Sequence, residues 1–408
     1  MNIEDMSEMG DLQLPDYKRT FLPDSTGHFS IKFQIDKANY FRLGRNILYL
    51  SPGDNLSMSI NYRWPDSSII NGNHSQENQY LKYTPFPKAG SFLEGGINIK
   101  ETIQQTIDAI LVVAKKREAS LRKYKNISND FRILEAARIK ADILNSLIDI
   151  KGYFPYIHKL TKDSLTSFTD EYNKIIEPYI DSYSKNNLNP SFLKLVVYRD
   201  VVQTIINNTK GHSENKRKIK DWINAYQLAE SITEMNEKKQ IYAVENKINA
   251  IQSPAYRNAV YTTFKELLKL GNGDTAKDFI FTSQNNESFD LKTFIGKVIY
   301  IDLWATWCGP CMEELPYLDT LKEKYKNNAE MVFIALSIDN NKLLWKTNLV
   351  NRKAQGIQGI IDRVKLMEYR VINIPRVIII DKDFKIASMN GPVPSNNNTV
   401  SLLDSLLQ

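Results

Sequence analysis

The sequence predicts a multidomain protein with an antiparallel β domain at residues 1–95, an all-α domain at residues 96–270 and an α/β domain at residues 274–408. Three observations lead to this division. Apolar residues alternate with polar ones near the N-terminus, recur at helical spacing in the middle, and form continuous runs towards the C-terminus. A chain of 408 residues is also too long for one ordinary core, so two or three domains are expected.

The N-terminal region carries short patterns that are typical of half-buried strands. Apolar and polar residues alternate at 31–35 and again at 56–62. Residues 41–50 form a further candidate strand, which is followed by the turn residues Ser51-Pro52-Gly53-Asp54-Asn55. The expected result is a small antiparallel sandwich or barrel.

The middle of the chain shows the periodicity of amphipathic helices. Ile103, Ile107 and Ile110 fall on one helical face, and Ser128 is a candidate N-cap for a second helix. Further helices are expected near 164–184, 191–208, 216–232 and 237–250, with breaks at Gly152, Pro178, Asn189-Pro190 and Gly211. The segment Gly271-Asn272-Gly273-Asp274 is expected to end this region as a flexible joint.

The last part of the chain alternates between strand and helix patterns. Residues 298–303, 331–338 and 377–380 are nearly continuous apolar runs, which are typical of strands buried on both faces. Between the first two runs, residues 308–325 present one apolar stripe at helical spacing. This pattern predicts an α/β domain.

Composition excludes several classes of function. The net charge of +6 is mild for 408 residues, and no basic motif supports nucleic-acid binding. No run of about 18 apolar residues is present that would span a membrane. The first residues, Met1-Asn2-Ile3-Glu4-Asp5, do not form a signal peptide, although a signal sequence or a lipid anchor removed from this chain stays open.

The two cysteines form a single Cys-x-x-Cys motif, Cys308-Gly309-Pro310-Cys311, at the expected start of a helix. Free backbone N–H groups and the helix dipole stabilise a thiolate at such a position. We therefore expect Cys308 to attack a disulfide and Cys311, one turn further in, to resolve the mixed disulfide. Pro310 has a φ angle that suits the first turn and lacks an N–H group that this turn does not need.

Two other interpretations of the cysteine pair are less favoured. A closed zinc site needs four ligands, but the four histidines (His28, His74, His158 and His212) lie outside this domain, so no metal is expected. A purely structural disulfide stays open, although the order strand, Cys-x-x-Cys, helix argues against it. The restriction of cysteine to this one pair is compatible with an oxidising compartment and also with the cytosol, so it does not determine the location of the protein.

The surrounding segment resembles the active site of the thioredoxin superfamily. The resemblance is carried by Ile301-Asp302-Leu303-Trp304-Ala305-Thr306-Trp307-Cys308-Gly309-Pro310-Cys311, by Pro316 in the helix, and by Ile374-Pro375, which matches the family's cis-proline. Glu314-Leu315-Pro316, Asp278-Phe279 and the insertion at 340–360 are similar to the TlpA/ResA branch of extracytoplasmic thiol:disulfide reductases. The resemblance implies a thioredoxin-like fold for residues 274–408.

The upstream residues resemble the accessory region of TlpA-like proteins from Bacteroidetes. This weaker similarity rests on Leu48-Tyr49-Leu50-Ser51-Pro52-Gly53-Asp54, on Asn71-Gly72 and on Glu77-Asn78-Gln79-Tyr80-Leu81. It implies no particular activity for residues 1–270.

The resemblance adds further candidate site residues. Asp302 occupies the place of the buried acid of thioredoxins, and Glu314 follows Cys311 by one turn, so both are candidates for proton transfer. The alternatives are a polar residue at a strand end for Asp302 and a dipole-stabilising acid for Glu314. Trp307, Ile374 and Pro375 are expected to bind the substrate, with Ile374 pairing with an extended client.

The predicted function is thiol:disulfide oxidoreduction, with reduction of protein disulfides as the expected direction. The alternatives are an oxidase or isomerase, and a ligand- or partner-binding protein of the cell envelope with an accessory redox domain. No cofactor is expected beyond the redox-active Cys308–Cys311 disulfide. The expected partners are disulfide-bearing client proteins and an electron donor, and the expected location is the periplasm or cell envelope if a signal sequence was removed.

Overall fold

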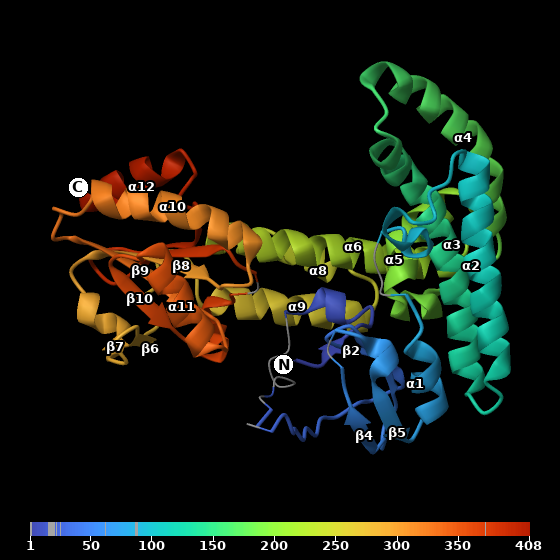
Figure 1. The fold of residues 1–408 in the computed structure, drawn as a ribbon, viewed down its shortest axis with the longest axis horizontal. Coiled ribbons are helices and arrows are strands. Elements are labelled where there is room, and N and C mark those ends of the chain that lie inside the picture. Colours follow the sequence, from blue (N-terminus) through green and yellow to red (C-terminus); the bar gives the residue numbers. More distant parts are fainter. Residues whose placement is uncertain are drawn as a thin grey trace. The chain divides into compact units, whose positions relative to one another are not determined.

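The computed structural model describes residues 2–14, 21, 23–24, 26–61, 63–85, 89–371 and 373–408. The chain forms two compact units, of which the first comprises Met1–Gln227 and Ile251–Val260 and the second Leu228–Ala250 and Tyr261–Gln408 (Figure 1). These units differ from the three predicted domains. The β region and most of the helical region share one unit because their cores are joined: the Tyr40 hydroxyl donates to Glu135 over 2.7 Å, and the Tyr49 and Phe131 rings are in contact.

The strands of the first unit form two small antiparallel sheets. One has the order β1 (Glu4–Asp5), β2 (Asn39–Leu43), β3 (Asn46–Leu50), and the other pairs β4 (Leu56–Ser59) with β5 (Ile69–Gly72). The strand predicted at 56–62 is therefore confirmed for 56–59, while residues 60–61 are not in a strand and Tyr62 lies outside the described residues. The single strand predicted at 41–50 is wrong, because the chain reverses at Gly44, whose φ is 60°.

The strand predicted at residues 31–35 is also wrong. These residues are described without regular strand structure. Ile31, Phe33 and Ile35 nevertheless pack, partly buried, against the apolar cluster of the first sheet. The alternation of apolar residues is thus explained by side-chain packing, which does not require the backbone to pair with a neighbouring strand.

The helices of the first unit range from seven residues in α1 to 30 residues in α3. Their bounds are α1 (Ser75–Leu81), α2 (Ile103–Lys123), α3 (Asn129–His158), α4 (Lys162–Ser184), α5 (Val196–Asn207) and α6 (Glu214–Glu234), and α6 continues into the second unit. The breaks predicted at Asn189-Pro190 and Gly211 are confirmed, since they fall between α4 and α5 and between α5 and α6. The breaks predicted at Gly152 and Pro178 are wrong, since Gly152 lies inside α3 and Pro178 inside α4. Buried residues on both sides of Gly152, such as Leu147, Ile150 and Phe154, hold α3 together across it.

No helix in the described ranges is both long enough and apolar enough to cross a bilayer.

The second unit begins with helices that precede the redox domain. These are α7 (Lys238–Tyr242), α8 (Glu245–Asn249) and α9 (Pro254–Lys269), of which α9 starts in the first unit. Arg370 donates to the carbonyls of Glu266 and Leu267 near the C-terminus of α9. This part of the predicted helical domain is therefore bound to the C-terminal domain.

The flexible joint predicted at 271–274 is wrong. Gly273 donates its N–H to the Ile386 carbonyl over 2.8 Å, and the Asn272 side chain accepts from the Met389 N–H over 2.9 Å. The Asp274 carboxylate forms an ion pair with Lys238 over 2.5 Å. Glycine permits many conformations in an isolated chain, but hydrogen bonds to a neighbouring strand select one of them here.

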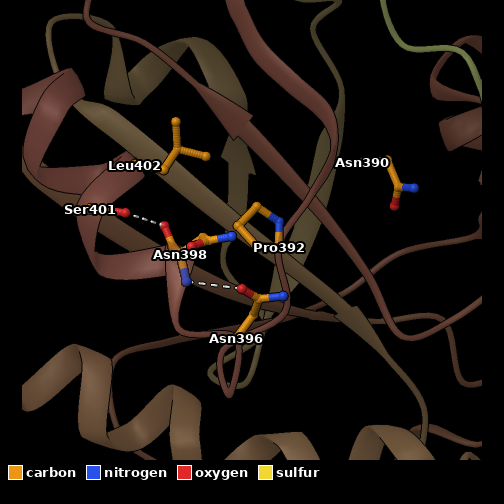
Figure 2. Close-up of a pocket in the computed structure, with 6 residues that line it drawn as sticks. All are labelled: Asn390, Pro392, Asn396, Asn398, Ser401 and Leu402. Carbon is orange, nitrogen blue, oxygen red and sulfur yellow. Dashed lines mark hydrogen bonds between the residues drawn. The ribbon is translucent and has the colours of Figure 1, made fainter.

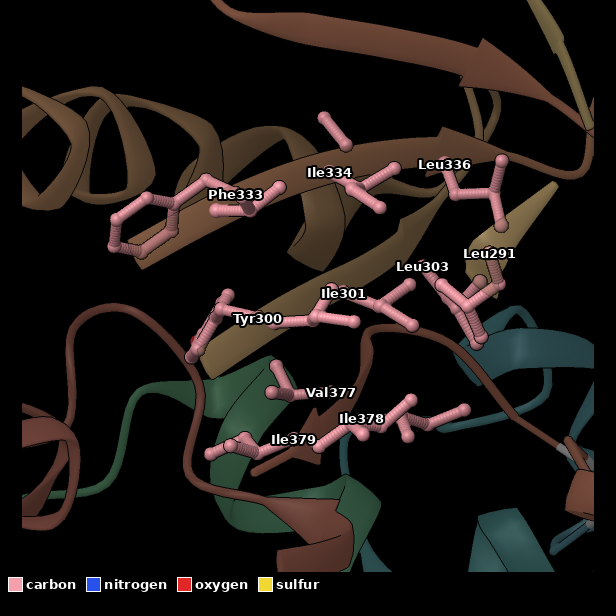
Figure 3. Packing of buried hydrophobic residues seen from close by; sticks show 14 of the residues in the cluster. Leu291, Tyr300, Ile301, Leu303, Phe333, Ile334, Leu336, Val377, Ile378 and Ile379 are labelled. Atoms are coloured by element: carbon pink, nitrogen blue, oxygen red, sulfur yellow. The ribbon is translucent and has the colours of Figure 1, made fainter. Parts of the chain in front are cut away.

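The core of the second unit is a seven-stranded mixed sheet in the order β12-β11-β8-β9-β10-β6-β7. The strands are β6 (Ile280–Ser283), β7 (Ser288–Asp290), β8 (Val298–Trp304), β9 (Met331–Ser337), β10 (Ile357–Ile360), β11 (Arg376–Ile380) and β12 (Ile386–Gly391). The strands β8 and β9 are parallel and every residue in them is buried, which confirms the two-faced burial predicted for these runs. Figure 3 shows how the side chains of β8, β9 and β11 pack against one another.

Three helices, α10 (Gly309–Lys324), α11 (Lys342–Arg352) and α12 (Asn398–Leu407), complete the fold. They form one layer, because Tyr325 after α10 donates to Asp404 of α12, and Arg352 at the end of α11 pairs with Asp319 of α10. The multidomain fold class, with its C-terminal α/β domain, is therefore confirmed. The loop between β8 and α10 lies at the carboxyl edge of the parallel strands, where open α/β sheets bind their ligands.

Candidate active site

The cysteine pair lies at the start of α10, as the sequence predicts. Cys308 is the N-cap residue, its Sγ accepts the Cys311 N–H over 3.2 Å, and the two cysteines are joined by a disulfide. Cys308 is 6% exposed and Cys311 is 1% exposed, while Gly309 and Pro310 lie exposed between them. A sulfur at this position faces the free N–H groups of the first turn, which stabilise a negative charge. The order of attack stays a prediction.

The loop before Cys308 is held by a buried carboxylate that the sequence reasoning missed. Asp339, just beyond the end of β9, accepts the Thr306 N–H over 2.9 Å and the Thr306 hydroxyl over 2.8 Å. The Ser337 hydroxyl donates to the same carboxylate over 2.8 Å. An acid at the carboxyl end of the strand next to β8 was a usable signal, because parallel strands end at one edge of a sheet.

We expect Asp339→Ala to slow disulfide reduction about tenfold, because it frees the loop that places Cys308. The Thr306 N–H would also lose its acceptor, which should lower the free energy of unfolding by about 1–3 kcal/mol. A suitable control is Asp404→Ala, which removes a carboxylate acceptor at the opposite end of α10. Equal rates of insulin reduction in the two variants would show that Asp339 does not position the loop.

Asp302 is buried, as its apolar neighbours on β8 predict. It is 1% exposed, and its Oδ1 has no hydrogen-bond partner within the described ranges. The pKa of this carboxyl is raised from 3.8 to about 7, mainly by burial and also by the charge of Glu314, against the lowering effect of Lys322 and Arg352. A carboxyl with such a pKa can exchange a proton at neutral pH.

Glu314 is held by a partner that the sequence reasoning also missed. Both of its carboxylate oxygens accept from Ser395, one from the N–H over 2.9 Å and one from the hydroxyl over 2.7 Å. Ser395 lies in the segment between β12 and α12, and no pattern in the sequence connects it with α10. The predicted reach of Glu314 to the dithiol stays a prediction.

The predicted substrate-binding residues differ in exposure. Trp307 is 66% exposed beside Cys308. Trp304 on β8, which is not among the predicted substrate-binding residues, is fully buried. The Ile374–Pro375 peptide bond is cis, as expected, and both residues are half-buried. Arg376 follows them and donates to the Met389 carbonyl over 2.8 Å.

A shallow hollow of about 550 Å³ lies beyond β12 (Figure 2). It is lined by Asn390, Pro392, Asn396, Asn398, Ser401 and Leu402. The Asn398 N–H donates to the Asn396 side chain, and the Ser401 hydroxyl donates to the Asn398 carbonyl. None of the predicted site residues lines this hollow.

Comparisons with known proteins agree with this geometry. A family model described as Redoxin matches residues 271–407. The thiol-disulfide oxidoreductase ResA of Bacillus thuringiensis subsp. konkukian is 34% identical over 128 residues, which cover 31% of this chain and 72% of that protein. ResA of Geobacillus kaustophilus is 28% identical over 152 residues, covering 36% and 86% respectively.

One solved structure is also similar in sequence. It is a Bacteroides vulgatus protein described as a thiol-disulfide oxidoreductase, 39% identical, and the match covers 34% of this chain and 98% of that one with a TM-score of 0.33. Given the ResA relatives, the Redoxin match and the Cys308–Cys311 disulfide at the start of α10, the chain belongs to the ResA family and is a thiol-disulfide oxidoreductase.

Proposed function

We propose that the protein reduces disulfides in client proteins through the Cys308–Cys311 couple. The observation that carries this proposal is the difference between the two sulfurs, since Cys308 caps α10 and Cys311 is buried one turn further in. The Gly309-Pro310 pair between the cysteines, typical of the reducing members of this fold, favours reduction over an oxidase or isomerase.

In the proposed reaction the Cys308 thiolate attacks one sulfur of the client disulfide. The client disulfide breaks, a Cys308–client mixed disulfide forms, and the released client sulfur takes a proton from water. Cys311 then loses its proton to the Asp302 carboxylate and attacks the Cys308 sulfur. The bond between Cys308 and the client breaks, and the departing client sulfur takes a second proton from water. The client leaves as a dithiol with two electrons and two protons gained, and the protein is left as the disulfide.

Three groups assist in this proposal. Trp307, exposed beside Cys308, contacts the client, and the backbone of Ile374 before cis-Pro375 pairs with it as an extended strand. Glu314, anchored by Ser395, supplies a negative charge near Asp302, which raises the pKa of that carboxyl and so its affinity for the proton of Cys311.

The proposed cycle needs an electron donor and a compartment. A donor dithiol must return two electrons to the Cys308–Cys311 disulfide after each turnover. We place the reaction in the periplasm or cell envelope, supported by the ResA-type domain.

The reduction potential of the couple tests the direction of the reaction. We expect a value near the thioredoxin value of about −270 mV, measured by equilibrating the full chain with glutathione or dithiothreitol buffers and quantifying free thiols by alkylation. A value above about −150 mV would contradict the proposal and favour an oxidase. The variant that lacks both cysteines is the control and should show no thiol alkylation.

A second candidate function concerns the first unit, which would bind a ligand or partner in the cell envelope. A hollow of about 450 Å³ in this unit favours it. Its lining includes Asn145 and Asp149 of α3 and Asp200 of α5, and burial raises the pKa of both acids.

A further inference from the structure

A cluster of three charged residues lies behind Asp302, between α10 and α11. Asp319 and Lys322 are one helical turn apart on α10, and Arg352 ends α11. The Asp319 carboxylate lies 3.5 Å from the Lys322 Nζ through one oxygen and 3.5 Å from the Arg352 Nη2 through the other. One acid therefore holds two cations, and the cluster keeps a net positive charge.

Both cations are held in place by further contacts. The Lys322 Nζ donates to the Gln355 carbonyl over 3.0 Å, and the Lys322 side chain is only 11% exposed. The Arg352 guanidinium lies over the Trp304 ring, 5.5 Å from its centroid. Trp304 and Asp302 are two residues apart on β8, so their side chains lie on the same face of the strand. The positive charge of Arg352 thus lies next to β8, the strand that carries Asp302.

Polar atoms on this face are enclosed without partners. The Asp302 Oδ1, the Trp304 Nε1 and the Arg352 Nη1 are buried and lack a hydrogen-bond partner in the part of the chain that the structure describes. With no hydrogen bond to satisfy the Oδ1, the ionised form of Asp302 depends on the charges around it. Those charges are Lys322 and Glu314 from α10 and Arg352 from α11. Tyr300, on the same face of β8, stays neutral because burial raises its pKa.

We propose that Lys322 and Arg352, anchored by Asp319, are positioning residues that set the proton affinity of Asp302 and thereby the pH range in which Cys311 is deprotonated. This inference rests on the proposed role of Asp302 as proton acceptor. Glu314 of α10 opposes the effect of the two cations, so charges of both signs act on the acid.

The sign of the expected effect follows from these charges. A nearby cation favours the ionised carboxylate and lowers its pKa, and burial raises the pKa. Removal of the Lys322 charge should therefore make Asp302 keep its proton to higher pH. Since the proton acceptor must be ionised, resolution of the mixed disulfide should then need a more alkaline solution.

The test measures the resolving step directly in the full chain. Cys308 of the reduced protein is converted to a mixed disulfide with a chromogenic thiol, and the release of that thiol is followed against pH. We expect Lys322→Met to move the midpoint of the profile upward by at least about 0.5 pH unit and to slow release at pH 7 about threefold. Lys322→Arg should restore the wild-type profile, because it keeps the charge.

The matched control is Lys324→Met, which removes an exposed lysine from the same helix. It should leave the profile unchanged. If Lys322→Met does not fold, Arg352→Met replaces it in the test. We expect Arg352→Met to shift the midpoint of the pH profile in the same direction. Infrared titration of the Asp302 carboxyl in each variant reports the proton affinity itself, which a merely structural role of Lys322 would not move.

The Asp302→Asn background separates this inference from the proposed function. We expect Lys322→Met to have no effect on the profile in that background. An unchanged profile in Lys322→Met alone, or an equal shift with and without Asp302, overturns the inference. If Asp302→Asn by itself leaves the pH profile unchanged, the proposed role of Asp302 as proton acceptor fails as well. This single variant therefore distinguishes a failure of the proposed function from a failure of the inference about Lys322 and Arg352.

Discussion

Cys311→Ser should convert the protein into a trap for its clients, whereas Cys308→Ser should be inactive. Cys308 caps α10, where the free N–H groups of the first turn stabilise its thiolate, and Cys311 lies buried behind it. Cys311→Ser therefore keeps the attacking sulfur but cannot release the mixed disulfide. Insulin reduction should fall by at least about a thousandfold in both variants, because a nucleophile and its resolving partner act as one unit.

The two variants differ in what they retain. The measurement is electrophoresis of the whole chain without reductant after exposure to cell-envelope extract, with wild type and the double serine variant as controls. Adducts should accumulate with Cys311→Ser and be released by dithiothreitol, and mass spectrometry would identify the clients. Equal trapping by both single variants, or trapping mainly by Cys308→Ser, would reverse the assigned roles.

Asp302→Asn should stabilise the protein at high pH while slowing catalysis. The pKa of Asp302 is raised by burial from 3.8 to about 7, so ionisation of this carboxyl opposes folding. The protonated form of Asp302 therefore favours the folded state. This contribution to the free energy of unfolding is fully present below about pH 4 and is lost as the pH rises through about 7. At pH 8 the gain from Asp302→Asn should approach about 4 kcal/mol as an upper limit, at about 1.4 kcal/mol per pKa unit.

Urea unfolding of the oxidised protein at pH 4, 6 and 8 tests this expectation. The gain should be close to zero at pH 4 and largest at pH 8, and the exposed Asp383→Asn should show no such trend. Insulin reduction near neutral pH should fall by about 100-fold, the lower range for loss of a proton-transfer group. A gain independent of pH would show that Asp302 is not a buried acid with a raised pKa.

The redox element could be predicted from the sequence because its signals are local. The helix predicted at 308–325 is α10 with Cys308 and Tyr325 as its capping residues, and the first two predicted strands match β8 and β9 within a residue. Each of these elements follows from continuous apolar runs and from helix-start chemistry. The predicted burial of Asp302 follows equally from its neighbours in the chain.

The errors arose where local rules compete with long-range contacts. Gly152 and Pro178 weaken an isolated helix, but α3 and α4 continue through them. In α3, burial of apolar residues on both sides of Gly152 maintains the helix. Gly273 would be flexible in a free chain, and its hydrogen bond to Ile386 of β12 removes that freedom. The residues around Gly273 do not indicate that a strand more than a hundred residues further along the chain will lie beside them.

The sequence by itself determined the chemistry of this protein: a dithiol at a helix start, a buried acid on the preceding strand and a cis-proline. Only the tertiary structure decided what surrounds that chemistry. Asp339 holds the loop, Ser395 holds Glu314, and Arg352 joins Lys322 behind Asp302. The physical reason is that a reactive pair spans four consecutive residues, whereas the charges and hydrogen bonds that tune it come from strands and helices which meet only when the sheet forms.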